Sequence, residues 1–355
     1  MNNNYNPNGQ FGGWGQNQYG VYNAPYYNYY SEQYRREQEK KNDKKILKTM
    51  GNWFGFGIIC FTVLAFIAGI IIGLLSTVFT KLNLLYNDDN MAMAYQIIAS
   101  VLFILIPFVI VYVVLKKKKI AGILPLGTTY NRKAAAGLTM LCVPLMIFST
   151  LGINFVSSII QEFFAITFTT GFEESKILGS EGIFIAVLST AVLPAILEEI
   201  IIRGIVMQPL RRFGDKFAIL ASALIFGIMH GNMVQIPYTV VAGLFLGYLA
   251  VATGSLWPSI ILHFINNFYS VALLAAYDNA GGTAGAVVTL LFMGMFVLSG
   301  IVGGLIYFPM NYRNPLKKGV DTLKTGEKFS ALFVNVPMIF AIIFLLFQTI
   351  GTIDF

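Results

Sequence analysis

Long apolar runs follow one another from about Met50 to the end of the chain, and they constrain the fold more than any other feature. Most of them approach or exceed the roughly 20 residues that a helix needs to cross the hydrocarbon core of a bilayer. Hydrophobic residues make up 56% of the chain and charged residues 12%, whereas a soluble domain carries about 25% charged residues. The sequence therefore predicts an all-α fold, a polytopic bundle of transmembrane helices.

We expect about nine spans, with eight as the alternative count. The nine cover residues 53–80, 92–115, 134–156, 182–207, 217–233, 236–252, 257–277, 283–308 and 330–350. They form a transmembrane domain over residues 49–355. A tail over residues 1–48 precedes it, first rich in Asn, Gly, Gln and Tyr and then in charged residues. This composition buries no core and predicts disorder.

The distribution of charge predicts the topology. Nine alternating spans put one set of basic segments on the same side of the membrane: 35–48, 116–119, 132–133, 211–216 and 313–328. Cytoplasmic loops carry the excess of Lys and Arg. We therefore expect a multi-pass protein of the plasma membrane with its N-terminus in the cytoplasm. The net charge of +7 lies at the ends of apolar runs, so it indicates a lipid bilayer as partner and no nucleic acid.

Pairs of glycines with GxxxG spacing let two helix backbones approach closely. Gly69 and Gly73, Gly243 and Gly247, and Gly300 and Gly304 have this spacing, for example. They predict close helix contacts at those positions.

The segment from Glu198 to Arg203 carries three ionisable side chains within one predicted span. Such a group costs about 2.5–3.5 kcal/mol at the centre of a bilayer on insertion scales, so a chain that keeps several pairs them or uses them. Glu199 and Arg203 are four residues apart on one helical face, where they can form an ion pair. Glu198 points about 100° away and is free to act as a general base. The other interpretation is an ion-pair cluster that only marks the end of the span.

The two histidines of the chain, His230 and His263, both lie within apolar runs. Asn267 follows His263 by four residues and shares its helical face. Imidazole can relay protons, and imidazole and amide N–H groups can donate hydrogen bonds to an oxyanion. One membrane histidine alone is more often a hydrogen-bonding contact between helices, but two of them downstream of the glutamate pair favour catalysis. Helical rise counted from the turn at 212–216 puts Glu198 and His230 at the same depth.

Three motifs therefore follow one another on successive predicted helices. They are EExxxR at Glu198–Arg203, FxxxH at Phe226–His230 and HxxxN at His263–Asn267. In this order, over about residues 182–275, they resemble the CPBP family, which comprises CAAX proteases and bacteriocin-processing proteins also called Abi. The resemblance implies an intramembrane endopeptidase. Its substrate would be a membrane-associated peptide or protein, either a prenylated CAAX-type tail or a bacteriocin-like precursor.

The resemblance also implies roles for the motif residues. Glu198 and His230 would activate a water molecule, and His263 and Asn267 would hold the oxyanion. The supporting residues would be Glu199, Arg203 and Phe226. A glutamate-dependent mechanism without cofactor is favoured. The alternative is a divalent metal such as zinc held by Glu198, His230 and His263 with one open position, although an HExxH motif is absent.

Two other functional classes stay open at this stage. A non-catalytic bacteriocin-immunity or scaffolding protein could keep the polar residues as contacts between helices. A proton-coupled transporter could use intramembrane Glu and His as a relay, but the chain lacks the paired inverted halves of many transporters. The complete motif set favours the enzyme.

Overall fold

The fold is all-α, as predicted. The computed structural model describes residues 24–81, 100–169, 177, 179–311 and 316–354. The helices are α1 (Ala24–Lys81), η1 (Ser100–Ile104), α3 (Leu105–Lys117), α4 (Arg132–Phe164), α5 (Gly179–Ala186), η2 (Val187–Val192), α6 (Leu193–Glu199), η3 (Ile200–Val206), α7 (Met207–Leu210), η4 (Arg211–Phe213), α8 (Asp215–Ile228), α9 (Ile236–Thr253), α10 (Trp257–Tyr307), η5 (Phe308–Met310), α11 (Thr325–Phe333) and α12 (Val336–Ile350). Two short strands, β1 (Thr167–Phe168) and β2 (Ile353–Asp354), pair antiparallel.

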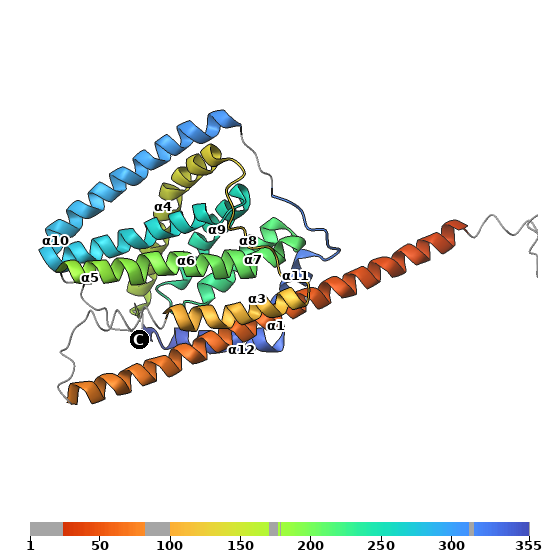
Figure 1. Cartoon of the computed structure of the whole chain (residues 1–355), viewed down its shortest axis with the longest axis horizontal. Helices are drawn as coiled ribbons and strands as arrows, with labels where there is room; N and C mark the ends of the chain where they lie inside the picture. The colour runs from red at the N-terminus through yellow and green to blue at the C-terminus, as the bar shows by residue number, and fades with distance from the viewer. Residues whose placement is uncertain (1–23, 82–99, 170–176, 178, 312–315, 355) are drawn as a thin grey trace, which may run out of the picture.

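Helices occupy all nine predicted ranges as far as these are described; residues 92–99 of the second range lie outside the described residues. Five described helical segments are each long and apolar enough to cross a membrane, and the bent pair α11 and α12, at 78°, makes a sixth candidate. Nine crossings stay a prediction, because α3 and α8 have only 13 and 14 residues. Two predicted spans also fall within α10. Its backbone leaves the helical conformation at Gly281, with φ +80°, and Figure 1 shows two arms diverging from this kink.

The predicted disorder of the tail is wrong for residues 24–48, because α1 begins at Ala24. The Glu, Gln, Lys and Arg residues that make this segment polar are also good helix formers. Tertiary contacts hold its last turns: Leu47 is fully buried and Asp43 is 5% exposed. Figure 1 shows the first turns of α1 projecting beyond the bundle. Residues 1–23 lie outside the described part of the chain.

Helix packing joins segments that are far apart in sequence. The main partners are α4 with α10, α8 with α9, and α1 with α11 and α12. Glycine permits the close approach of α8 and α9, since a Cβ atom at Gly243 would lie 3.0 Å from the Cα of Ala223. The predicted packing role therefore holds for Gly243. At Gly69 an added Cβ would meet no described atom within 4 Å, so the role of that pair stays a prediction.

Three of the predicted basic segments lie together at one end of the bundle. Asp43 of α1 forms an ion pair with Arg212, at 3.2 Å, and also accepts a hydrogen bond from the backbone N–H of Thr322. Lys328 donates to the carbonyl of Phe213 at 2.7 Å, and Gly214 forms a bridge with Lys318. These contacts join the positive charge of α1, of the α7–α8 turn and of the segment before α11, as the charge-based topology requires.

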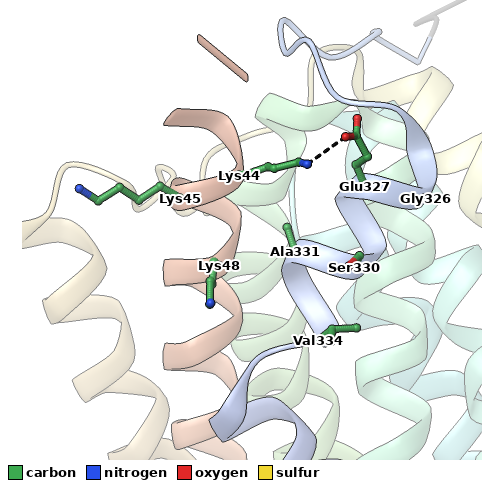
Figure 2. Close-up of a pocket in the computed structure, with 8 residues that line it drawn as sticks. All are labelled: Lys44, Lys45, Lys48, Gly326, Glu327, Ser330, Ala331 and Val334. Atoms are coloured by element: carbon green, nitrogen blue, oxygen red, sulfur yellow. Dashed lines mark ion pairs between the residues drawn. The ribbon is translucent and has the colours of Figure 1, made fainter. Parts of the chain in front are cut away.

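A groove of about 460 Å³ lies between α1 and α11 at this end. Figure 2 shows the residues that line it. Glu327 accepts contacts from the ammonium groups of Lys40 and Lys44, each 2.9 Å from Oε1. In Figure 2, Lys45 and Lys48 point away from Glu327. The lysines therefore do not converge on one point, and the groove is an ionic contact between two helices.

Candidate active site

The two glutamates sit at the end of a short regular helix between two π-helical segments. Helix α6 ends at Glu199, η2 precedes it and η3 follows it. Pro194 lies in the first turn of α6, directly after η2, so its missing N–H removes one hydrogen bond from a continuous helical segment. π-helical turns widen a helix and often occur at functional sites. Here they shift the register of the helix on both sides of the glutamate pair.

Glu199 is fully buried and forms the predicted ion pair with Arg203. Its Oε1 atom lies 2.9 Å from Nη1 of Arg203, and both side chains are 0% exposed. Two further contacts surround the guanidinium: Nη2 donates to the carbonyl of Gly243 at 3.3 Å, and the ring of Phe226 lies 4.6 Å from Cζ. A buried charge needs such compensation. The pair thus ties the glutamate-bearing helix to α8 and α9.

His263 links the two glutamates from α10. Its Nδ1 atom lies 3.0 Å from Oε1 of Glu199, and its Nε2 atom lies 3.8 Å from Oε2 of Glu198. A carboxylate only accepts, so Nδ1–H donates to Glu199. The His263 side chain is 8% exposed, whereas the Glu198 side chain is 23% exposed. Glu199 therefore contacts both Arg203 and His263, whereas the carboxylate of Glu198 is partly exposed.

Glu198 and His230 line the same cavity, which measures about 210 Å³. His230 lies just past the end of α8, and its Nδ1 atom is 2.8 Å from the carbonyl of Phe226. Since a carbonyl only accepts, Nδ1 carries the proton, and Nε2 of the neutral ring is left as an acceptor. The cavity wall consists of Phe61, Ile104, Glu198, Ile201, Ile202, Phe226, Met229, His230 and Gln235. It is apolar apart from three groups that can bind water or a peptide.

Phe226 contacts both histidines, with ring centroids 4.9 Å from that of His230 and 5.9 Å from that of His263. Asn267 lies apart from the cavity wall. Its Nδ2 donates to the carbonyl of Thr190 in η2 at 3.0 Å, and its Oδ1 accepts from Asn266. Six of the seven predicted site residues therefore adjoin one another directly, and Asn267 joins α10 to η2. Its role at an oxyanion stays a prediction.

Gln235 is a polar group of the cavity that the sequence motifs did not identify. It follows Asn232 by three residues in the turn that precedes α9, a spacing at which an Asn side chain can bond to the backbone. Asn232 Oδ1 accepts from the backbone N–H of Gln235 at 2.9 Å. That spacing was a usable signal. Nothing in the sequence pointed to Phe61 or Ile104, which come from helices more than 90 residues earlier.

The alternative of a zinc ion held by Glu198, His230 and His263 stays a prediction. Among the described residues, no three His, Cys, Asp or Glu side chains are arranged to hold one. We therefore derive no step through a metal.

These features define a helical membrane protein in which Glu198, His230 and His263 lie close together between its helices. Residues 180–269, about a quarter of the chain, match the family model described as Type II CAAX prenyl endopeptidase Rce1-like. The match contains all three motifs, and it confirms the resemblance to the CPBP family of CAAX proteases. No curated protein and no solved structure matches the chain.

Proposed function

We propose that this protein is an intramembrane endopeptidase that cleaves a membrane-associated peptide or protein with a water molecule activated by Glu198. The observation that carries the proposal is the shared cavity: Glu198 and His230 both line the same space of about 210 Å³. Two acceptors can hold both protons of one water. A carboxylate in apolar surroundings is a suitable general base.

Glu199, Arg203 and His263 position the base in this mechanism. The buried ion pair fixes the helix that carries Glu198, and His263 stands between the two carboxylates. In its protonated form His263 would also donate from Nε2, so it could stabilise negative charge that develops in the cavity. Catalysis then depends on residues from separate helices, α6, α8 and α10. These residues come together through the packing of the helices.

The substrate class proposed here is a membrane-bound peptide with an apolar anchor, either a prenylated CAAX-type tail or a bacteriocin-like precursor. Six apolar side chains line the cavity beside the polar groups, so a large apolar side chain next to the scissile bond would be accepted. We place the protein in the plasma membrane with the basic end of the bundle, and so the N-terminal tail, in the cytoplasm.

The test is cleavage by the purified full chain in proteoliposomes. The substrate panel would contain internally quenched peptides with and without a prenylated C-terminal CAAX sequence, together with apolar leader peptides, and products would be identified by mass spectrometry. We expect cleavage by the wild type and none by Glu198→Ala. Equal cleavage by both proteins contradicts the proposal. A wild type that cleaves no peptide of the panel favours the immunity or scaffolding class instead.

A further inference from the structure

Three polar residues line the candidate cavity among the described residues, namely Glu198, His230 and Gln235. Hydrolysis of a peptide bond needs acceptors that take a proton from water and also a donor for the carbonyl oxygen. Ionised Glu198 only accepts, and neutral His230 offers Nε2 as an acceptor because Nδ1–H is bonded to Phe226. Gln235 is the remaining polar group of the wall.

The orientation of the Gln235 amide follows from its hydrogen bonds. The backbone N–H of Gln235 can only donate, so the oxygen of the Asn232 amide faces it, at 2.9 Å. Asn232 Nδ2 must then point to the carbonyl of His230, at 3.0 Å, and to the Gln235 side chain, at 3.2 Å. Because Asn232 Nδ2 is a donor, the Gln235 atom that faces it must be the acceptor Oε1. The NH₂ group of Gln235 is left over, with no partner among the described residues.

The turn that carries this amide is held in place. Asn232 is 6% exposed, and its backbone carbonyl accepts from the N–H of Ile236 as α9 begins. Gly231 has φ +62°, a conformation that favours glycine. The turn runs directly from His230 to Gln235, so a small fixed loop orients both cavity residues. A donor that is already oriented needs no reorganisation when charge develops beside it.

We propose that the side-chain NH₂ of Gln235 donates to the carbonyl oxygen of the scissile bond and stabilises the oxyanion of the tetrahedral intermediate. This inference rests on the proposed function. Glu198 takes one proton from water as the water oxygen bonds to the carbonyl carbon, and the C=O π electrons move onto oxygen. The intermediate collapses with cleavage of the C–N bond, and the proton held by Glu198 passes to the leaving nitrogen. Asn232 is the positioning residue for Gln235.

Two substitutions separate catalysis from structure. Gln235→Leu removes the donor and the contact with Asn232, whereas Gln235→Glu keeps an oxygen for Asn232 Nδ2 and removes the N–H donor. Loss of one oxyanion donor lowers kcat by about 10²–10³-fold. We expect this loss in both variants, with KM changed by less than about threefold and with the melting temperature of the wild type. The exposed Gln38 of α1 supplies the matched controls, Gln38→Leu and Gln38→Glu.

The experiment uses the full chain in proteoliposomes and whichever prenylated or apolar peptide of the panel the wild type cleaves, with Glu198→Gln measured in parallel. If Glu198→Gln is inactive while Gln235→Leu keeps the wild-type kcat, this inference is wrong and the proposed function stands. If Gln235→Glu keeps the wild-type kcat while Gln235→Leu does not, the contact with Asn232 is what matters and the inference is also wrong. If Glu198→Gln cleaves like the wild type, or the wild type cleaves nothing, both proposals fail.

Discussion

Arg203 is among the largest fully buried side chains described, and it shows how this chain keeps charge within apolar surroundings. Its guanidinium meets a carboxylate, a backbone carbonyl and an aromatic ring at once. Removal of one member of a buried ion pair is far more costly than removal of both, because the remaining charge is left without compensation. The contribution of this ion pair to the free energy of unfolding can therefore be measured with single and double substitutions.

Arg203→Met should lower the free energy of unfolding by about 3–5 kcal/mol, because Glu199 stays buried without its cation. The double variant Glu199→Gln/Arg203→Met should recover part of this loss. The measurement is reversible unfolding in detergent micelles, and the control is Arg36→Met on the exposed face of α1, where no ion pair with a described residue is lost. An unchanged stability in Arg203→Met would show that the pair does not hold the site.

Helical spacing in the sequence predicts contacts between residues of one helix. The spacing of four between Glu199 and Arg203 predicts their ion pair, and the structure contains it. The contact of His263 with Glu199 spans 64 positions, and no periodicity indicates it. The motifs predict that these residues belong to one site, but only tertiary packing decides that His263 contacts Glu199 more closely than Glu198.

At the scale of helices, the contact of α8 with α9 supports both Phe226 and the turn at His230. Gly243→Val should lower the free energy of unfolding by about 1–3 kcal/mol, the usual cost of overpacking, because its Cβ would press on the backbone of Ala223. Gly69→Val is the matched control, since an added Cβ there meets no described atom within 4 Å. Equal stability of both variants would exclude close packing at Gly243.

The contact of α1 with α11 should respond to pH. Lys40, Lys44 and the N–H of Lys324 lower the pKa of Glu327, which lies before the predicted span 330–350, from 4.5 to about 2. A lowered folded-state pKa adds stability above the unfolded value and loses it as the pH falls through the folded value. Glu327→Gln should therefore lower the melting temperature at pH 6, and its difference from the wild type should shrink between about pH 4.5 and 2. A difference that does not vary with pH would contradict the contact.

At the scale of the whole molecule, composition and periodicity predicted the helical class and the ranges of the helices. The tail was misread because a charged, polar segment fits both a disordered chain and a long helix that continues out of a span. Only its contacts with Arg212, Thr322 and Glu327 decide between them. The cavity was likewise beyond prediction in detail, since Phe61 and Ile104 reach it from α1 and η1.

The proposed mechanism depends on the carboxylate of Glu198 as the base for water in that cavity. The most direct measurement is the single-turnover cleavage rate of the full chain in proteoliposomes for the wild type, Glu198→Gln and the exposed control Glu181→Gln. General-base catalysis contributes about 10²–10⁴-fold. We expect a loss of at least this size in Glu198→Gln and none in Glu181→Gln. A Glu198→Gln protein that cleaves at the wild-type rate would contradict the proposed mechanism.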